Sequence, residues 1–70
     1  MKKYNFPSGV VVVKEMQHEI SKKIYWQVKF VGHGLFGWGI SKDITQDEFN
    51  SFDAERAELF MAKTQKMLSV

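Results

Sequence analysis

The chain has 70 residues, no cysteine and a formal net charge of +2. This length leaves room for one domain with one core, and the lack of cysteine excludes disulfides and thiolate zinc sites. The charge is too small to indicate a polyanionic partner by itself, whereas an apolar fraction of 44% is typical of a folded domain. We therefore predict a single domain over residues 1–70. Because its core must be small, self-association or docking onto a partner is expected.

The charges divide unevenly along the chain. Residues 1–44 hold seven lysines and three acidic residues (net +4), whereas residues 45–70 hold three basic and five acidic residues (net −2). This asymmetry argues against acidic mimicry of DNA and permits a basic strand face to meet an anionic partner.

No segment of the sequence resembles a membrane span or a signal peptide. No purely apolar run exceeds the four residues of Val10–Val13, far short of the roughly 20 residues that a membrane span needs. Lys2 and Lys3 are followed by a polar, mixed stretch instead of the apolar run of a signal peptide. We therefore expect no membrane partner and a cytoplasmic location.

The N-terminal part of the chain predicts a leader followed by a strand. Residues 1–8 are mixed in character and end in turn-forming residues at positions 7–9. The β-branched run Val10–Val13 favours extended backbone and opens a strand that fades through residues 14–19. Because successive side chains alternate, Val11 and Val13 share one face, and the other face carries Val10, Val12, Lys14 and Met16.

Residues 24–31 show the clearest alternation in the chain, after a polar hinge of hairpin length at residues 20–23. We predict that the apolar set points into the core and that the mixed set meets water or a partner. The expected core set is Ile24, Trp26, Val28 and Phe30, and the mixed set is Tyr25, Gln27, Lys29 and Val31.

A third, shorter strand is expected from Leu35 to Ser41, after a glycine-rich turn at residues 32–34. Its inward side chains would be Phe36, Trp38 and Ile40. The predicted sheet then spans residues 9–41, and residues 41–44 lead out of it.

Residues 45–68 predict a helical region. Thr45 and Glu48 match a capping box, in which each side chain accepts a hydrogen bond from the backbone N–H of the other residue. Phe49 and Phe52 lie away from the apolar stripe of the later residues, so we expect a kink near residues 50–51, or a short helix followed by a longer one. The predicted fold class is α+β: a three-stranded antiparallel β-meander with the C-terminal helix packed on one face.

No motif in the chain supports catalysis or a cofactor. Residues 32–37 match G-x-G-x-x-G after a strand, but a dinucleotide site needs a helix that begins in the glycine turn, and no helix signal occurs before Thr45. His18 and His33 are the only histidines, and neither has partners at metal-ligand or catalytic spacing. We therefore predict that the protein is not an enzyme and that it has no cofactor, metal or small-molecule substrate.

Two surfaces are candidates for partner binding. The mixed strand face carries lysines around apolar and aromatic side chains, and the helix carries apolar side chains where polar ones are expected. A solvated sheet face, whose lysines oppose edge-to-edge aggregation, is the alternative interpretation of the first surface. The candidate residues are Lys14, Met16, Tyr25, Gln27, Lys29 and Val31 on the strands, and Leu59 and Met67 on the helix.

These observations predict a small non-catalytic binding protein that acts through protein–protein contacts. Its size suits an accessory, regulatory or inhibitory protein of the kind that compact phage or mobile-element genomes encode, a comparison that rests on size alone. The alternative is a small nucleic-acid-binding protein whose basic strand face contacts phosphates while Tyr25 stacks on a base.

Overall fold

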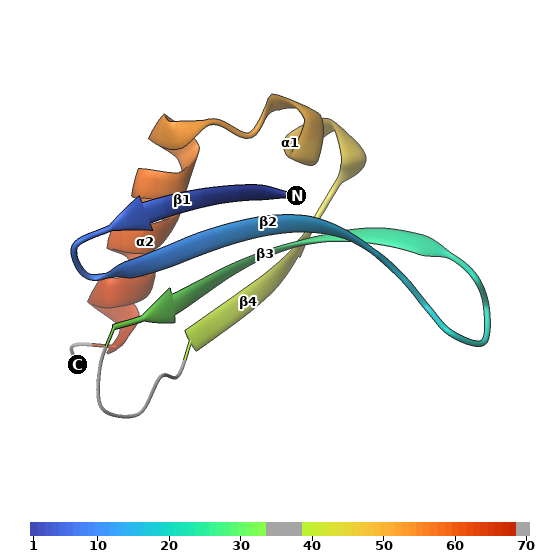
Figure 1. Cartoon of the computed structure of the whole chain (residues 1–70), viewed down its shortest axis with the longest axis horizontal. Helices are drawn as coiled ribbons and strands as arrows, with labels where there is room; N and C mark the ends of the chain where they lie inside the picture. The colour runs from blue at the N-terminus through green and yellow to red at the C-terminus, as the bar shows by residue number, and fades with distance from the viewer. Residues whose placement is uncertain (34–38, 69–70) are drawn as a thin grey trace.

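A computed structural model describes residues 1–33 and 39–68 of the chain, with the side chains of residues 67 and 68 excepted. It contains an antiparallel sheet in the order β1-β2-β3-β4, followed by two helices (Figure 1). The predicted α+β class and the antiparallel meander are confirmed. The elements are β1 (Lys2–Phe6), β2 (Gly9–Gln17), β3 (Ile24–Gly32), β4 (Gly39–Ile44), α1 (Gln46–Ser51) and α2 (Ala54–Leu68).

The sheet has four strands rather than the predicted three, because the expected leader at residues 1–8 contains β1. This strand pairs with β2 along its whole length, from Lys2 opposite Val13 to Phe6 opposite Gly9. Tyr4 and Phe6 pack against the core, and Lys2 shares their side of the strand. The alternation of β1 is hidden in the sequence because a lysine occupies its first inward position.

The last strand begins and ends later than predicted. The expected strand covers Leu35–Ser41, whereas β4 runs from Gly39 to Ile44 and pairs with β3 along that length. Residues 41–44 therefore belong to the sheet instead of leading out of it. Ile40 and Ile44 point inward, but the charged Lys42 lies between them on the same side of the strand. This lysine hides the apolar alternation of β4 in the sequence. Residues 34–38, including the predicted core residues Phe36 and Trp38, lie outside the described residues.

The core lies between the sheet and the helices, and β2 and β3 supply most of it. In the register of these strands, Val13 stands opposite Val28 and Val11 stands opposite Phe30. All four side chains are buried, together with Ala57 of α2. The partly buried residues that pack around this centre are Tyr4, Phe6, Ile44, Phe49, Phe52, Phe60 and Met61.

The predicted core set of β3 is confirmed only in its C-terminal half. Val28 and Phe30 are buried and Trp26 is partly buried, but Ile24 is 51% exposed. Ile24 lies in the hairpin arm, which we define as residues 16–25 and which Figure 1 shows reaching away from both helices. The alternation of apolar and polar side chains along β3 therefore continues beyond the part of the strand that the helices bury.

The predicted break in the helical region is confirmed. Thr45 Oγ1 accepts a hydrogen bond from the Glu48 N–H at 3.1 Å, and a Glu48 carboxylate oxygen accepts one from the Thr45 N–H at 3.2 Å. These two bonds complete the capping box of α1, which ends at Ser51. Asp53 Oδ1 then accepts from the Arg56 N–H at 2.9 Å and so caps the first turn of a separate helix, α2.

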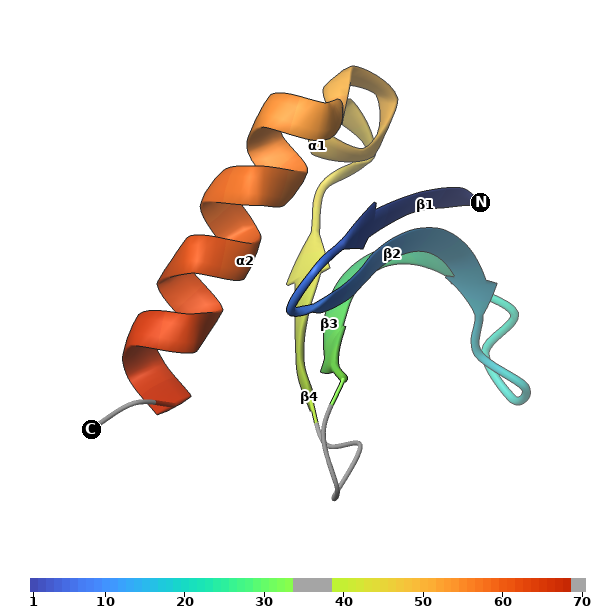
Figure 2. The ribbon, with the colours of Figure 1, turned by 60° about the vertical axis from the view of Figure 1, so that its left-hand side comes forward.

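Both helices lie on the same side of the sheet (Figure 2). α1 packs against β3, and α2 packs mainly against β2 and β3. No described element covers the opposite side of the sheet. The fold therefore has two layers, with one face of the sheet packed and the other open among the described residues.

Lys2 joins the first strand to the end of α1. Its Nζ donates to the backbone oxygens of Phe49 at 2.7 Å and Phe52 at 3.0 Å, and it lies 5.3 Å from the centre of the Phe49 ring. Next to it, the Tyr4 hydroxyl donates to the Phe52 oxygen at 3.3 Å. The last carbonyls of a helix lack intrahelical partners and form the negative end of its dipole, so an ammonium group satisfies them well.

Replacing Lys2 with methionine tests this tie, because methionine keeps an aliphatic stem and lacks the ammonium group. We expect Lys2→Met to lower the free energy of unfolding by about 1–2 kcal/mol, since charge-assisted hydrogen bonds to partly buried carbonyls are lost. Urea denaturation followed by circular dichroism measures the change. Lys3→Met is the matched control: Lys3 is exposed on the other face of β1, and its loss should cost less than about 0.5 kcal/mol. Equal costs would show that Lys2 does not hold α1 to the sheet.

Candidate protein-binding surfaces

The strand register brings thirteen residues together on the open side of the sheet. Val11 and Val13 point to the helices, so the alternate residues of β2 and their partners on neighbouring strands point the other way. We call this surface the outer sheet face. Its residues are Lys3 and Asn5 of β1; Val10, Val12, Lys14 and Met16 of β2; Tyr25, Gln27, Lys29 and Val31 of β3; and Gly39, Ser41 and Asp43 of β4.

The predicted site residues divide between this face and the helix. Leu59 lies on α2, on the helix side of the sheet, and is 65% exposed. The backbone of Met67 belongs to α2, but its side chain lies outside the described residues. The six predicted residues on the strands all lie on the outer sheet face: Lys14, Met16, Tyr25, Gln27, Lys29 and Val31.

Three valines form the apolar centre of the outer sheet face. Val10 stands opposite Val31, and Val12 is the next outward residue of β2. We call these three residues the valine patch. Each is half-buried by its neighbours on the sheet, although no described element covers it. Lys3 and Lys29 flank Val12 on the two adjacent strands, so the patch has cations on both sides.

An aromatic pair lies on the hairpin arm, beyond the valine patch and the row formed by Lys14 and Gln27. The His18 ring stacks on the Tyr25 ring, with their centres 4.4 Å apart and their planes inclined by 25°. The turn below the pair is held by the His18 N–H, which donates to the Lys23 oxygen at 3.0 Å. The His18 side chain is exposed despite this stacking.

The lysines of the outer sheet face have no partners within the described part of the chain. The ammonium groups of Lys3, Lys14 and Lys29 make no ion pair or hydrogen bond among these residues. Asp43 is the one carboxylate on the same face. The outer sheet face therefore has a net positive charge that no ion pair among the described residues neutralises.

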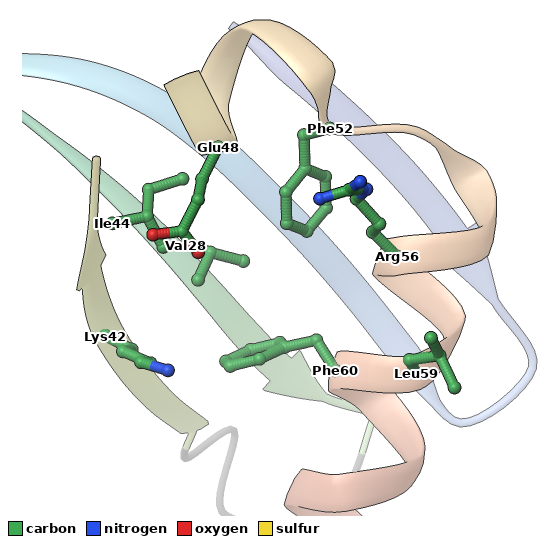
Figure 3. A pocket seen from close by; sticks show the side chains of 8 residues that line it. All are labelled: Val28, Lys42, Ile44, Glu48, Phe52, Arg56, Leu59 and Phe60. Atoms are coloured by element: carbon green, nitrogen blue, oxygen red, sulfur yellow. The ribbon is translucent and has the colours of Figure 1, made fainter. Parts of the chain in front are cut away.

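A concave surface lies on the helix side of the sheet, between β4 and α2. One hollow has a volume of about 220 Å³. Figure 3 shows the side chains that line it, with Lys42 on the side of β4, Phe60 on the side of α2 and Val28 between them. An adjoining hollow of about 350 Å³ shares Lys42 and Phe60 and extends to Ile40 and Lys63. We call the two hollows together the β4–α2 groove.

The sequence indicates one wall of this groove and not the groove itself. Leu59, which is a predicted partner-binding residue, lines the smaller hollow together with Arg56. The spacing of Ile40 and Ile44 along an extended strand is the signal that could have located the opposite wall. The hollow between these walls depends on where α2 lies over the sheet, which no sequence pattern shows.

The described residues contain no constellation for metal binding and no membrane-spanning helix. No group of three or more His, Cys, Asp or Glu residues within 1–33 and 39–68 is placed to hold a metal ion. Over the same ranges, no helix combines the length and apolar character needed to cross a membrane.

Comparison with known proteins gives no relative for this chain. No protein-family model matches it, and neither the curated proteins nor the solved structures contain a significant match. Any functional inference therefore depends on the geometry and charge of the surfaces described above.

The two sets of valines in β2 should differ in their importance for folding. We expect Val13→Thr to lower the free energy of unfolding by about 1–3 kcal/mol, because it replaces a methyl group among buried apolar side chains with a hydroxyl. Val12→Thr makes the same change in the valine patch and should cost less than about 0.5 kcal/mol. Urea denaturation of both variants gives the comparison. A cost for Val12→Thr that matches Val13→Thr would show that the patch is already buried in the free protein.

Proposed function

We propose that this protein is a non-catalytic binding protein whose outer sheet face docks onto an apolar, acid-rimmed surface of another protein. The observation that carries the proposal is the valine patch, which is flanked by unpaired lysines and covered by no described element. A docking protein of this size can act as an accessory, regulatory or inhibitory subunit of its partner.

The chemistry of the valine patch supports a protein partner. An antiparallel sheet that is packed on one side usually presents polar side chains on the other. Here Val10, Val12 and Val31 break that pattern at the centre of the open face. An apolar centre with a polar rim is the usual anatomy of a protein interface, in which the centre excludes water and the rim sets orientation.

The charge of the outer sheet face favours a different protein over a second copy of this chain. A two-fold dimer places the same surface patch on both subunits. Such a dimer through this face would bring Lys3, Lys14 and Lys29 of one copy toward the same lysines of the other. Like charges at an interface oppose association, whereas an acidic rim on a partner would attract all three lysines.

Single-stranded nucleic acid is the second candidate, and the Tyr25–His18 stack favours it. Nucleic-acid-binding surfaces combine aromatic side chains that stack on bases with cations that contact phosphates. Among the described residues, one aromatic pair of this kind lies beside the outer sheet face, on the hairpin arm and away from the centre of the face. Among the described residues, the centre of this face is aliphatic and has no ring on which a base could stack, so a protein partner fits the face better.

Two lysines on opposite sides of the sheet provide a matched test of the docking face. Lys29 lies on the outer sheet face, and Lys42 lies on the helix side of the neighbouring strand; both are exposed. Three immobilised forms of the protein capture partners from nuclease-treated lysate of the native cells: wild type, Lys29→Glu and Lys42→Glu. We expect the proposed partner to be retained by wild type and Lys42→Glu and depleted about fivefold or more by Lys29→Glu. Equal retention by all three forms would contradict docking through this face.

Binding to a fluorescent single-stranded oligonucleotide tests the second candidate. Phosphate contacts make such binding fall steeply with salt, and both Lys29→Glu and Tyr25→Ala would weaken it. The proposed protein-docking role predicts no such salt-dependent binding at physiological ionic strength. Tight binding with a steep salt dependence, lost in both variants, would replace the protein partner with nucleic acid.

A further inference from the structure

The helix layer is narrower than the sheet beneath it. Four strands spaced about 4.8 Å apart make a sheet roughly 19 Å wide, whereas neighbouring packed helices need only about 8–10 Å each. α2 packs mainly against β2 and β3, and no described helix lies over the inner side of β4. In Figure 3, Lys42 and Ile44 line the hollow between β4 and α2, and Ile44 also packs against the edge of the core.

The walls of the β4–α2 groove carry apolar side chains that the core does not fully bury. Ile40 and Ile44 of β4 and Phe60 of α2 are only partly buried. Leu59 lines the groove and remains 65% exposed, so it contributes little to the core. The part of β4 that lines the groove, from Ile40 to Ile44, spans about 13 Å, which is the length of about nine residues of α-helix. The groove thus has the length and the apolar lining for a helix beside α2.

The charges around the groove are mainly positive. Lys42 of β4 and Arg56 and Lys63 of α2 all line it. The carboxylate in the lining, Glu48, accepts hydrogen bonds from the backbone and the hydroxyl of Thr45 in the capping box. Within the described residues, no carboxylate pairs with the three cations. An occupant with acidic side chains would therefore complement the groove.

We propose that the β4–α2 groove binds an amphipathic helix of a partner protein, with an apolar stripe against Ile40, Ile44 and Leu59 and acidic residues against the three cations. Binding of this kind places one apolar face of a helix into a preformed groove. The groove and the outer sheet face lie on opposite sides of the sheet, so each can bind without the other. A second copy of this chain is a poorer occupant, because its α2 carries three basic and two acidic residues instead of a mainly acidic set.

The probe is a synthetic peptide of about 18 residues, a length at which an isolated helix can form. It carries leucines at i, i+3, i+4 and i+7, glutamates beside that stripe, and alanine and glutamine elsewhere. Its control replaces every glutamate with lysine and keeps the leucine stripe. Titration into the isotopically labelled full chain, followed by amide NMR shifts, reports affinity and location together.

We expect saturable shifts along β4 and along residues 56–64 of α2, and affinity for the acidic peptide about tenfold above that for the basic one. The difference should shrink as salt is added. Leu59→Glu and Lys42→Glu should each weaken binding about fivefold or more. Lys29→Glu, which makes the same charge change on the outer sheet face, should leave it unchanged. Because Leu59, Lys42 and Lys29 are all exposed, these variants are expected to fold, and circular dichroism checks that they do.

Three outcomes would overturn the proposal. The first is the absence of saturable shifts at millimolar peptide, and the second is equal binding of the acidic and basic peptides. The third is a dimer of the free protein, detected by sedimentation, that Leu59→Glu dissociates, because the groove would then belong to a second copy. None of these outcomes bears on docking through the outer sheet face, which Lys29→Glu tests separately.

Discussion

Four consecutive valines in one strand shape both faces of this protein. Because side chains alternate in β structure, Val11 and Val13 reach into the core while Val10 and Val12 must point to the other side. Both helices lie on the first side, so the second pair remains on a surface that no described element covers. β3 repeats the arrangement, with Phe30 inward and Val31 outward. Both strands are thus apolar on both faces, but helices cover only one of these faces. This mismatch is the physical basis of the proposed docking role.

The helical layer is held over one part of the sheet by contacts where α1 ends and α2 begins. Lys2 and Tyr4 bind the last carbonyls of α1, and Asp53 starts α2 in a new direction. This arrangement lays α2 over the middle of the sheet and leaves the inner side of β4 open. The strands therefore present lysines to solvent on both sides of the sheet. Lys3, Lys14 and Lys29 lie on the outer sheet face, and Lys42 lies beside the β4–α2 groove.

The sequence predicted those parts of the fold in which a local pattern is sufficient. Alternation in residues 10–16 and 24–31 assigned both faces of β2 and β3, and the Thr45–Glu48 spacing located the start of α1. β1 was missed because Lys2 occupies an inward position whose partners lie at the end of α1, about fifty residues away along the chain. Ile24 was assigned to the core because alternation carries no information about where the covering helix stops. The β4–α2 groove was missed for a related reason, since it depends on the placement of α2.

The most direct test of the central claim is site-specific photo-crosslinking in native cells. A photo-reactive amino acid is placed at position 12, in the valine patch, or at position 65, an exposed site on α2. Docking through the outer sheet face predicts a discrete protein adduct from position 12 that survives nuclease and is absent from position 65. Adducts from position 65 alone, or nuclease-sensitive adducts from position 12, would contradict it.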